Sequence, residues 1–529
     1  MKKKKGFTLV ELLGVIAILA LIVAVAAPPI VNQIKKSRST FDKATLSLIY
    51  TAADSYVDNK QNDYPNINEN TYCVTLDTLI KSGELKESII NIDKESEIAV
   101  NQIVKIAVNN DLYNYSLVEA NKCTEYSKPT APELSNGMIP IVYNGTNWIK
   151  ADINNEWYDY NSQEWANAVL VTAATRVAYQ NALAGTTINE ADVLAYLVWI
   201  PRYRYKLFNV GATLVTSQTI EIMFEDKWHS KSNGSINGSW LTHPAFTFGN
   251  SEANGIWVGK FETTGDATTP TIKPNIGSLT GQNTNAQFTT SQKFSNTTAY
   301  GLSAINDSHM MKNIEWGAVA YLSQSDYGKY GNPTYTGGTG LEKEIYINNI
   351  NTNLTTGFLG TITGCAGNTV SADMVRSSSC PVGNQYQTTQ GVKASTTGNI
   401  YGIYDMSGGS WEQTMGVMYN SDNLTLMTLS SGISQATLDS TTMNRYLDKY
   451  IYGTTYNNQL DYDRRHLGDA TGEVRSWNSD YDAFVEATSS WFIRGGAYNN
   501  TTDAGVFNFN RLMGGGAGEF AFRVVILGE

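Results

Sequence analysis

The chain has 529 residues and a net charge of −11, and 42% of its residues are hydrophobic. Its 16 Phe, 11 Trp and 31 Tyr supply enough ring surface for packed cores, which excludes a disordered or low-complexity protein. The negative charge argues against general binding to nucleic-acid phosphate, so we predict no nucleic-acid partner. The length predicts two or three domains.

The N-terminal region contains a long apolar stretch. Residues 12–34 carry no charged side chain, and this stretch exceeds the roughly 20 residues that a helix needs to cross a bilayer. Lysines fill positions 2–5, so the positive-inside rule places the N-terminus in the cytoplasm. We therefore expect a membrane anchor whose extracytoplasmic bulk lies at the cell surface or in a pilus-like fibre.

One acidic residue, Glu11, lies at the start of this stretch, where a charge is costly and usually marks a function. A plain signal anchor leaves Glu11 unexplained. A secretory signal peptide cleaved near residues 24–26, where the side chains are small, leaves it unexplained too. Both are alternatives to a third interpretation.

The segment from Gly6 through Phe7 to Glu11 resembles the prepilin cleavage and methylation motif of type IV pilins and pseudopilins. The resemblance implies that a prepilin peptidase cleaves after Gly6 and that Phe7 becomes N-methylated. Glu11 of a neighbouring subunit can neutralise the freed amine of Phe7 in a low-dielectric bundle, which explains the acid. We therefore predict the prepilin peptidase, other pilin subunits and the membrane as partners.

The predicted organisation follows from breaks in the sequence pattern. Pro28 and Pro29 should kink or interrupt the N-terminal helix. Farther on, Asn144-Gly145 predicts a β-hairpin, and a helix is expected after Asn189-Glu190. In chain order the predicted parts are a prepilin leader at 1–6, a transmembrane pilin helix at 7–50, a pilin-like head at 51–126, a linker at 127–140, a small β module with a helix at 141–197 and a large domain at 198–529.

The predicted head carries two patterns of alternating apolar and polar residues, at 104–108 and 114–118, which predict strands. Cys73 and Cys123 bracket these strands. A disulfide between them is permitted outside the membrane, and two unpaired thiols are the alternative.

The large domain contains five short motifs, at residues 255–263, 313–321, 399–412, 494–498 and 520–525. Together and in this order they resemble the formylglycine-generating-enzyme (sulfatase-modifying factor-like) superfamily, a branch of the C-type-lectin-like folds. The resemblance implies a large C-type-lectin-like domain. The expected fold class is therefore α+β, with a long N-terminal pilin helix, a small β head and this domain.

Several residues of these motifs have a predicted structural role. Trp411 is expected to pack beneath a turn at Gly408-Gly409, where glycine accepts a positive φ. Arg494 or Arg523 is expected to fork onto a buried carboxylate and tie down the C-terminal strand, with Glu412 as the candidate partner. Solvated arginines are the alternative.

The resemblance does not extend to the family's chemistry. The enzyme's copper site needs a thiolate pair shortly after the Arg494 motif, and residues 498–522 contain no cysteine. Cys365 and Cys380 lie upstream, where we expect a structural disulfide. The family's Gly-Asn-Val-Trp-Glu motif, whose asparagine contributes to a calcium site, reads Gly408-Gly409-Ser410-Trp411-Glu412 here, so Gly409 stands in place of the asparagine and removes one oxygen ligand of that site. The four histidines lack metal-ligand spacing, so we predict no cofactor, no metal site and no catalytic residue.

The last predicted site is a ligand-binding face near the C-terminus. Phe507 and Phe509 alternate with Asn508 and Asn510, so the rings are expected to enter the core and the amides to face outward. The segment also resembles the variable C-terminus of lectin-fold proteins that retroelements diversify, and a merely polar loop surface is the alternative. The predicted ligand-binding residues, of types that binding loops favour, are Tyr498, Asn499, Asn500, Thr502, Asn508, Asn510 and Leu512.

These observations predict a non-enzymatic, surface-displayed minor pilin or adhesin that binds an extracellular protein or glycan through its C-terminal domain. Two alternatives remain. One is a structural pseudopilin of a secretion or DNA-uptake system. The other is an enzyme that kept the fold and changed its chemistry.

Overall fold

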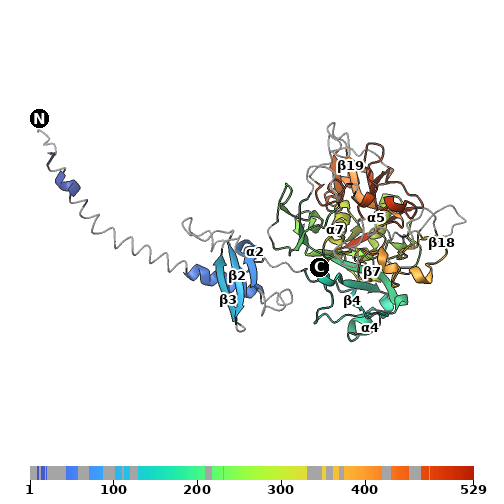
Figure 1. The fold of residues 1–529 in the computed structure, drawn as a ribbon, viewed down its shortest axis with the longest axis horizontal. Coiled ribbons are helices and arrows are strands. Elements are labelled where there is room, and N and C mark those ends of the chain that lie inside the picture. Colours follow the sequence, from blue (N-terminus) through green and yellow to red (C-terminus); the bar gives the residue numbers. More distant parts are fainter. Residues whose placement is uncertain are drawn as a thin grey trace. The chain divides into compact units, whose positions relative to one another are not determined.

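The computed structural model places most of the chain in two compact units (Figure 1). These are Met1–Ser127 with Trp228–Ser230, and Lys128–Lys227 with Lys231–Glu529. The described residues are 9–10, 13–17, 20, 43–57, 71–86, 102–109, 112–118, 129–208, 217–229, 231–329, 348, 350–352, 361–367, 375–419, 430–451, 466–475 and 477–528.

The first unit is a helix packed on a three-stranded antiparallel sheet of order β1-β2-β3. The helix covers residues 43–57. Its buried residues Ile49, Ala53 and Tyr56 follow helical spacing and form one apolar cluster with Val104 and Ile106 of the sheet. The labelled elements are β1 (Thr71–Thr75), α2 (Leu76–Lys81), β2 (Ile103–Asn109) and β3 (Leu112–Val118).

The strands β2 and β3 confirm the two strands predicted in the head. In β3, Tyr113, Tyr115 and Leu117 are half-buried, whereas Asn114 and Ser116 are exposed. The alternation in the sequence therefore indicates a sheet with one face packed against the helix side of the unit and the other face exposed to solvent. Within the part of the chain that is described, no helix is long and apolar enough to cross a membrane, and the span predicted at 12–34 lies largely outside that part.

The second unit contains a seven-stranded antiparallel sheet of order β16-β24-β13-β7-β6-β4-β5. Strand β24, near the C-terminus, lies between β16 and β13, so the last strand of the chain is the second strand from one edge of the sheet. The central strand β7 is almost completely buried, which matches its continuous apolar sequence. The strands are β4 (Met138–Tyr143), β5 (Trp148–Lys150), β6 (Asn167–Val171), β7 (Val193–Pro201), β13 (Gly255–Gly259), β16 (Ser308–Met310) and β24 (Val524–Ile526).

This sheet corrects two details of the predicted organisation. The predicted boundary between residues 197 and 198 falls inside β7, so the strands of the 141–197 segment belong to the large sheet. The hairpin at Asn144-Gly145 is present between β4 and β5. The helix expected after Asn189-Glu190 is a single 3₁₀ turn followed by β7, because an apolar run rich in Val, Leu and aromatic residues favours a strand. A helix of this region, α4 (Ala173–Asn181), instead precedes that turn.

The segment predicted as a linker at 127–140 is packed against the same sheet from residue 129 onward. The indole Nε1 of Trp199 donates to the carbonyl oxygen of Thr130 at 3.1 Å. The indole Nε1 of Trp257 donates to the carbonyl oxygen of Glu133 at 2.7 Å. Its prolines and polar residues therefore form an ordered strap that leads into β4.

A second sheet has the order β20-β19-β21-β22, with β23 also paired to β19. Helices α5 and α7 contact β19 and lie between it and β7 in Figure 1. The unit thus mixes helices with several sheets, as an α+β fold does. These elements are α5 (Thr284–Ser291), α7 (Asn313–Ser323), β19 (Trp411–Tyr419), β20 (Asp448–Ile451), β21 (Trp491–Arg494), β22 (Phe509–Leu512) and β23 (Phe520–Phe522).

Shorter elements complete the second unit. Their strands form the three-stranded sheet β10-β8-β9 and the pairs β11-β12, β14-β15 and β17-β18, and two short helices, α6 and α9, accompany them. They are β8 (Tyr203–Lys206), β9 (Ile222–Phe224), β10 (Trp240–Thr242), β11 (Thr247–Phe248), β12 (Ser251–Glu252), β14 (Thr264–Gly265), β15 (Pro270–Thr271), β17 (Ile350–Thr352), β18 (Val375–Ser377), α6 (Lys293–Asn296) and α9 (Gln435–Leu438).

Candidate functional site

A buried ion pair fixes the C-terminal segment of the second unit. The Nε of Arg523 donates to Glu412 Oε2 at 3.1 Å, and its Nη2 donates to the other carboxylate oxygen. The same guanidinium donates to the carbonyl oxygens of Gly259 at 2.8 Å and Tyr404 at 2.9 Å. Both charged side chains are buried. The structure therefore shows the predicted fork for Arg523, and it ties the last strands to β19 and β13.

Arg494 is also buried, and its guanidinium donates to several neutral oxygens. It donates to Asn313 Oδ1 and to the carbonyl oxygen of Asp469 at 2.9 Å each, and to that of Ala470 at 2.8 Å. Its Nε donates to the carbonyl oxygen of Asn508 at 3.0 Å. Arg494 thus positions the loops on either side of β21.

Two further carboxyl groups, Glu262 and Asp405, lie close to Glu412. Burial raises the pKa of Glu262 well above its usual range, and the nearby charges of Asp405 and Glu412 raise it further. Burial also raises the pKa of Asp405 and of Glu412, although Arg523 opposes both shifts. Among these three acids Arg523 bonds to Glu412, and burial together with the neighbouring negative charges disfavours ionisation of Glu262.

The predicted glycine turn lies against Glu262. Gly408 and Gly409 have φ values of 74° and 73°, which confirms the positive φ expected there. The backbone N–H of Ser410 donates to Glu262 Oε1 at 2.8 Å. A Cβ on Gly409 would lie 2.6 Å from that oxygen. Trp411 is buried directly after the turn, in a cluster with Phe520.

Lys260 is a buried cation that the sequence reasoning missed. Its Nζ donates to Asn167 Oδ1 at 2.8 Å and to the carbonyl oxygens of Ile400 at 2.6 Å and Gly402 at 2.9 Å. Burial lowers its pKa well below the usual range. Three acceptors suit the three N–H groups of an ammonium. The available signal was a lysine and a glutamate, Glu262, directly after the apolar sequence of β13.

The cysteines and the processing residues are placed as follows. Cys365 and Cys380 form the predicted disulfide, with a Cα–Cα distance of 5.8 Å. Cys73 is buried on β1 and is disulfide-bonded. The predicted partner Cys123 and the processing residues Gly6, Phe7 and Glu11 lie outside the described residues.

The predicted ligand-binding residues do not share one surface. Tyr498 is 1% exposed and packs with Trp411, and Asn508 is completely buried, so the prediction of both as surface residues was wrong. The predicted alternation fails because β22 begins only at Phe509. Asn508 lies before it, and its Nδ2 donates to the carbonyl oxygen of Asp503. Phe507 and Phe509 consequently enter two separate apolar clusters.

The other predicted residues remain at least partly accessible. Asn499 and Thr502 are exposed, whereas Asn500, Asn510 and Leu512 are half-buried. The side chain of Asn500 is engaged locally, because its Oδ1 accepts the backbone N–H of Ala497 at 2.6 Å.

A neighbouring loop adds an aromatic residue that the sequence reasoning missed. Tyr481 is 46% exposed, and its backbone N–H donates to the carbonyl oxygen of Asp503 at 3.0 Å. We call Tyr481, Asn499 and Thr502 the C-terminal loop face. Thr501 has a φ of 54°, a conformation that is strained for a β-branched residue and often marks functional loops.

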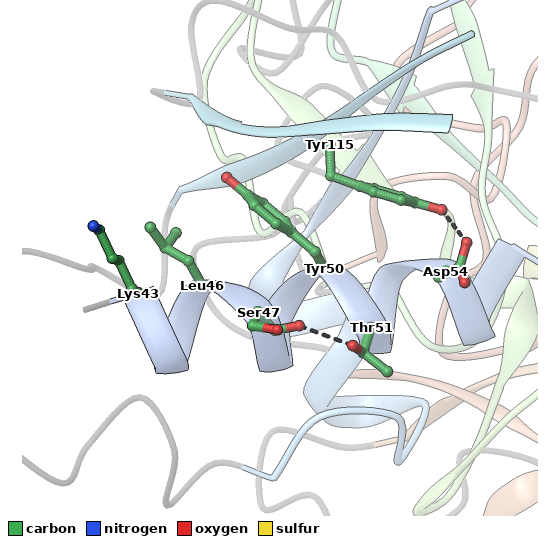
Figure 2. A pocket seen from close by; sticks show the side chains of 7 residues that line it. All are labelled: Lys43, Leu46, Ser47, Tyr50, Thr51, Asp54 and Tyr115. Atoms are coloured by element: carbon green, nitrogen blue, oxygen red, sulfur yellow. Dashed lines mark hydrogen bonds between the residues drawn. The ribbon is translucent and has the colours of Figure 1, made fainter. Parts of the chain in front are cut away.

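The first unit has an open groove of about 440 Å³ along its helix (Figure 2). Tyr50 and Tyr115, which line it, stack with ring centroids 5.9 Å apart. The hydroxyl of Tyr115 donates to Asp54, and the backbone N–H of Leu117 donates to the hydroxyl of Tyr50 at 3.2 Å. The lining residues are Lys43, Leu46, Ser47, Tyr50, Thr51, Asp54 and Tyr115.

The described residues show no group of three or more His, Cys, Asp or Glu side chains placed to hold a metal ion. The buried carboxyl groups around Arg523 are instead occupied by hydroxyl and backbone donors. The Oε2 of Glu262 accepts the hydroxyl of Ser278, and Asp405 Oδ2 accepts the backbone N–H of Gly364 at 2.6 Å. These hydrogen bonds connect the buried acids to the backbone and side chains around them.

Comparison with known proteins identifies the N-terminal motif. Residues 1–27 match the family model of the prokaryotic N-terminal methylation motif. No curated protein matches the chain. The match confirms the predicted type IV pilin-like prepilin motif, which implies processing by a prepilin peptidase, membrane anchoring and assembly with pilin subunits. The chain is therefore a surface- or pilus-associated protein.

Proposed function

We propose that the chain is a non-enzymatic minor pilin that acts as an adhesin through a C-type-lectin-like second unit. The observation that carries this proposal is the methylation motif at residues 1–27, placed ahead of a unit that spans most of the chain. A unit of this size would crowd a repetitive shaft, so a tip or minor position in the fibre fits better.

The contacts between the resembling motifs support a C-type-lectin-like fold. Arg523, in the last motif, bonds to Glu412, to the carbonyl of Tyr404 and to the carbonyl of Gly259, which belong to two other motifs. Arg494, in the fourth motif, bonds to Asn313 of the second. The backbone N–H of Gly408, in the third motif, donates to the carbonyl oxygen of Gly495, in the fourth, at 3.0 Å, so these hydrogen bonds connect all five segments.

The loops around β21 and β22 support a binding role. The C-terminal loop face combines an exposed ring with amide and hydroxyl groups, which suits a polar protein or glycan surface. The loops that carry its residues follow buried segments that the hydrogen bonds of Arg494 and Arg523 hold in place. If retroelements diversify this segment, Asn499 and Thr502 should differ between isolates while both arginines stay constant.

A non-enzymatic role is supported because the sequence lacks residues that the family's chemistry needs. Residues 498–522 lack the thiolate pair of the copper enzyme, and the acids near Gly409 bond to the fold itself. Oxidation of a peptide thiol by the copper-loaded chain would contradict this part of the proposal.

The adhesin role is tested by attachment of the full chain to host cells and glycan arrays. The triple variant Tyr481→Ala, Asn499→Ala and Thr502→Ala should lose at least ten-fold in attachment, with an unchanged melting temperature. The control variant Asn181→Ala with Leu183→Ala, two exposed residues at the end of α4, should attach normally. Normal attachment by the triple variant would favour a structural pseudopilin.

A further inference from the structure

Tyr481 is held at the C-terminal loop face through both of its backbone polar groups. Its N–H donates to the carbonyl oxygen of Asp503 at 3.0 Å, and its carbonyl oxygen accepts the N–H of Phe509 at 3.2 Å. The carbonyl oxygen of Asp503 also accepts the Nδ2 of Asn508, which is completely buried. Because the core already holds this backbone in place, little ordering is needed when a ligand binds.

Asp503 adds an exposed acid to this part of the surface. Two acids in the loop before β21 are paired with arginines. Asp482 pairs with Arg475 at 2.7 Å, and Glu486 is 3.3 Å from Arg511. Asp503 is exposed, and no cation among the described residues pairs with it. Its carboxylate is therefore open to hydrogen-bond donors of a ligand.

The exposed side chains of this region favour a sugar over a protein surface. Among the described residues from 477 to 528, Tyr481 and Met513 are the only exposed large hydrophobic side chains. Protein interfaces instead gather several aromatic and aliphatic anchors at their centre. One ring flanked by hydroxyl, amide and carboxylate groups matches a single sugar residue, which has an apolar face of C–H groups and a rim of hydroxyl groups.

We propose that the C-terminal loop face binds an uncharged sugar residue of a glycan, with the ring of Tyr481 against the apolar face of the sugar and the carboxylate of Asp503 accepting its hydroxyl groups. This inference rests on the proposed adhesin role and names its ligand class. The same carboxylate repels sialic acid and sulfated sugars, because they bring a negative charge against a fixed one. The net charge of −11 acts in the same direction.

A glycan array with the purified full-length chain tests the ligand class. The probes are glycans that end in a neutral hexose or N-acetylhexosamine, and the same glycans capped with sialic acid or sulfate. The chain should bind the best neutral probe at least about ten-fold more tightly than its capped forms. Equal binding of the two sets, or a preference for the capped set, would overturn the inference.

The role of the acid is tested by Asp503→Asn, which removes the charge and keeps a similar shape. This variant should bind the neutral probe about ten-fold more weakly, because hydrogen bonds to a charged acceptor are lost. It should also discriminate less between neutral and capped probes. Glu156→Gln, at an exposed acid between β5 and β6, is the matched control and should bind as the parent chain does. Unchanged binding by Asp503→Asn, at an unchanged melting temperature, would contradict the proposed contact.

The role of the ring is tested by two changes at Tyr481. Tyr481→Phe keeps the ring and should bind within about two-fold of the parent chain, whereas Tyr481→Ala should bind about ten-fold more weakly. Equal binding by all three chains would show that no sugar lies against this ring.

Attachment to host cells separates the inference from the proposed function. Enzymatic removal of the surface glycans should abolish attachment of the full chain. Attachment that persists after this treatment would overturn the sugar ligand in favour of a protein receptor, and would leave the adhesin role in place. No attachment of the parent chain to untreated cells or to any glycan would overturn the adhesin role itself.

Discussion

At the residue scale, the most informative feature is the group of three acids around one arginine. Glu262, Asp405 and Glu412 are all buried, and Arg523 bonds to Glu412 alone among them. A carboxyl group in this position is more stable with its proton, because burial and neighbouring negative charge disfavour ionisation. Glu262 therefore keeps its proton to a higher pH in the folded chain than in the unfolded chain.

This assignment predicts how stability changes with pH. The folded pKa of Glu262 lies above the ordinary value of 4.5, so its contribution is complete below pH 4.5 and declines as pH rises toward the folded pKa. Glu262→Gln mimics the protonated acid and removes this decline. In urea unfolding, the free energy of unfolding of the variant should rise relative to that of the parent chain by up to about 1.4 kcal/mol per pH unit in that window. Parallel stability curves for the two chains would contradict a protonated Glu262.

Single residues also show where sequence reasoning fails. The sequence offered Arg494 and Arg523 as alternative partners of Glu412, and the structure selects Arg523. Lys260 escaped notice because its acceptors, among them Asn167 Oδ1 and the carbonyl of Gly402, are neutral groups far away in the chain. No charge pattern along the sequence encodes such a contact.

At the element scale, the glycine turn before β19 combines a special backbone conformation with close packing against a buried side chain. Gly409 combines a φ of 73° with a Cβ position only 2.6 Å from Glu262 Oε1. Gly145, in the hairpin between β4 and β5, has a φ of 91° and nothing within 4 Å of its Cβ position. The two glycines thus share a backbone region and differ in crowding.

Alanine at these two positions should separate the two effects. Gly145→Ala should cost about 1–2 kcal/mol, the price of a left-handed conformation for an L residue. Gly409→Ala should cost at least about 1 kcal/mol more, because the methyl group must displace Glu262. Thermal unfolding of the full chain measures both. Equal losses would show that the turn adapts without disturbing the acid.

The elements themselves divide into those that local sequence specifies and those that it does not. Strands β2 and β3 were predicted because one face is covered and the other wet, which leaves an alternating pattern. Strand β7 was split by a predicted domain boundary because a strand buried on both faces has no alternation to mark its ends. Asn508 was misplaced for a related reason, since β22 begins at Phe509, two residues after Phe507, where the predicted alternation already starts.

At the scale of the whole molecule, the chain joins a short processing and assembly motif to a large unit with its own buried framework. The motif was predictable because its chemistry is local: a cleavage site and an acid within a few residues. The exposed surface of the second unit was only partly predictable. Tyr481 comes into contact with Asp503 through folding, whereas Tyr498, which adjoins Asn499 in sequence, is buried.

The central claim is that the leader is removed and the chain is delivered to a pilus-like fibre. Mass spectrometry of the mature protein from the cell envelope tests this claim most directly. We expect an N-terminal peptide that begins with N-methylated Phe7. A peptide that still carries the lysines at positions 2–5, or one that begins at Ala27, would contradict it.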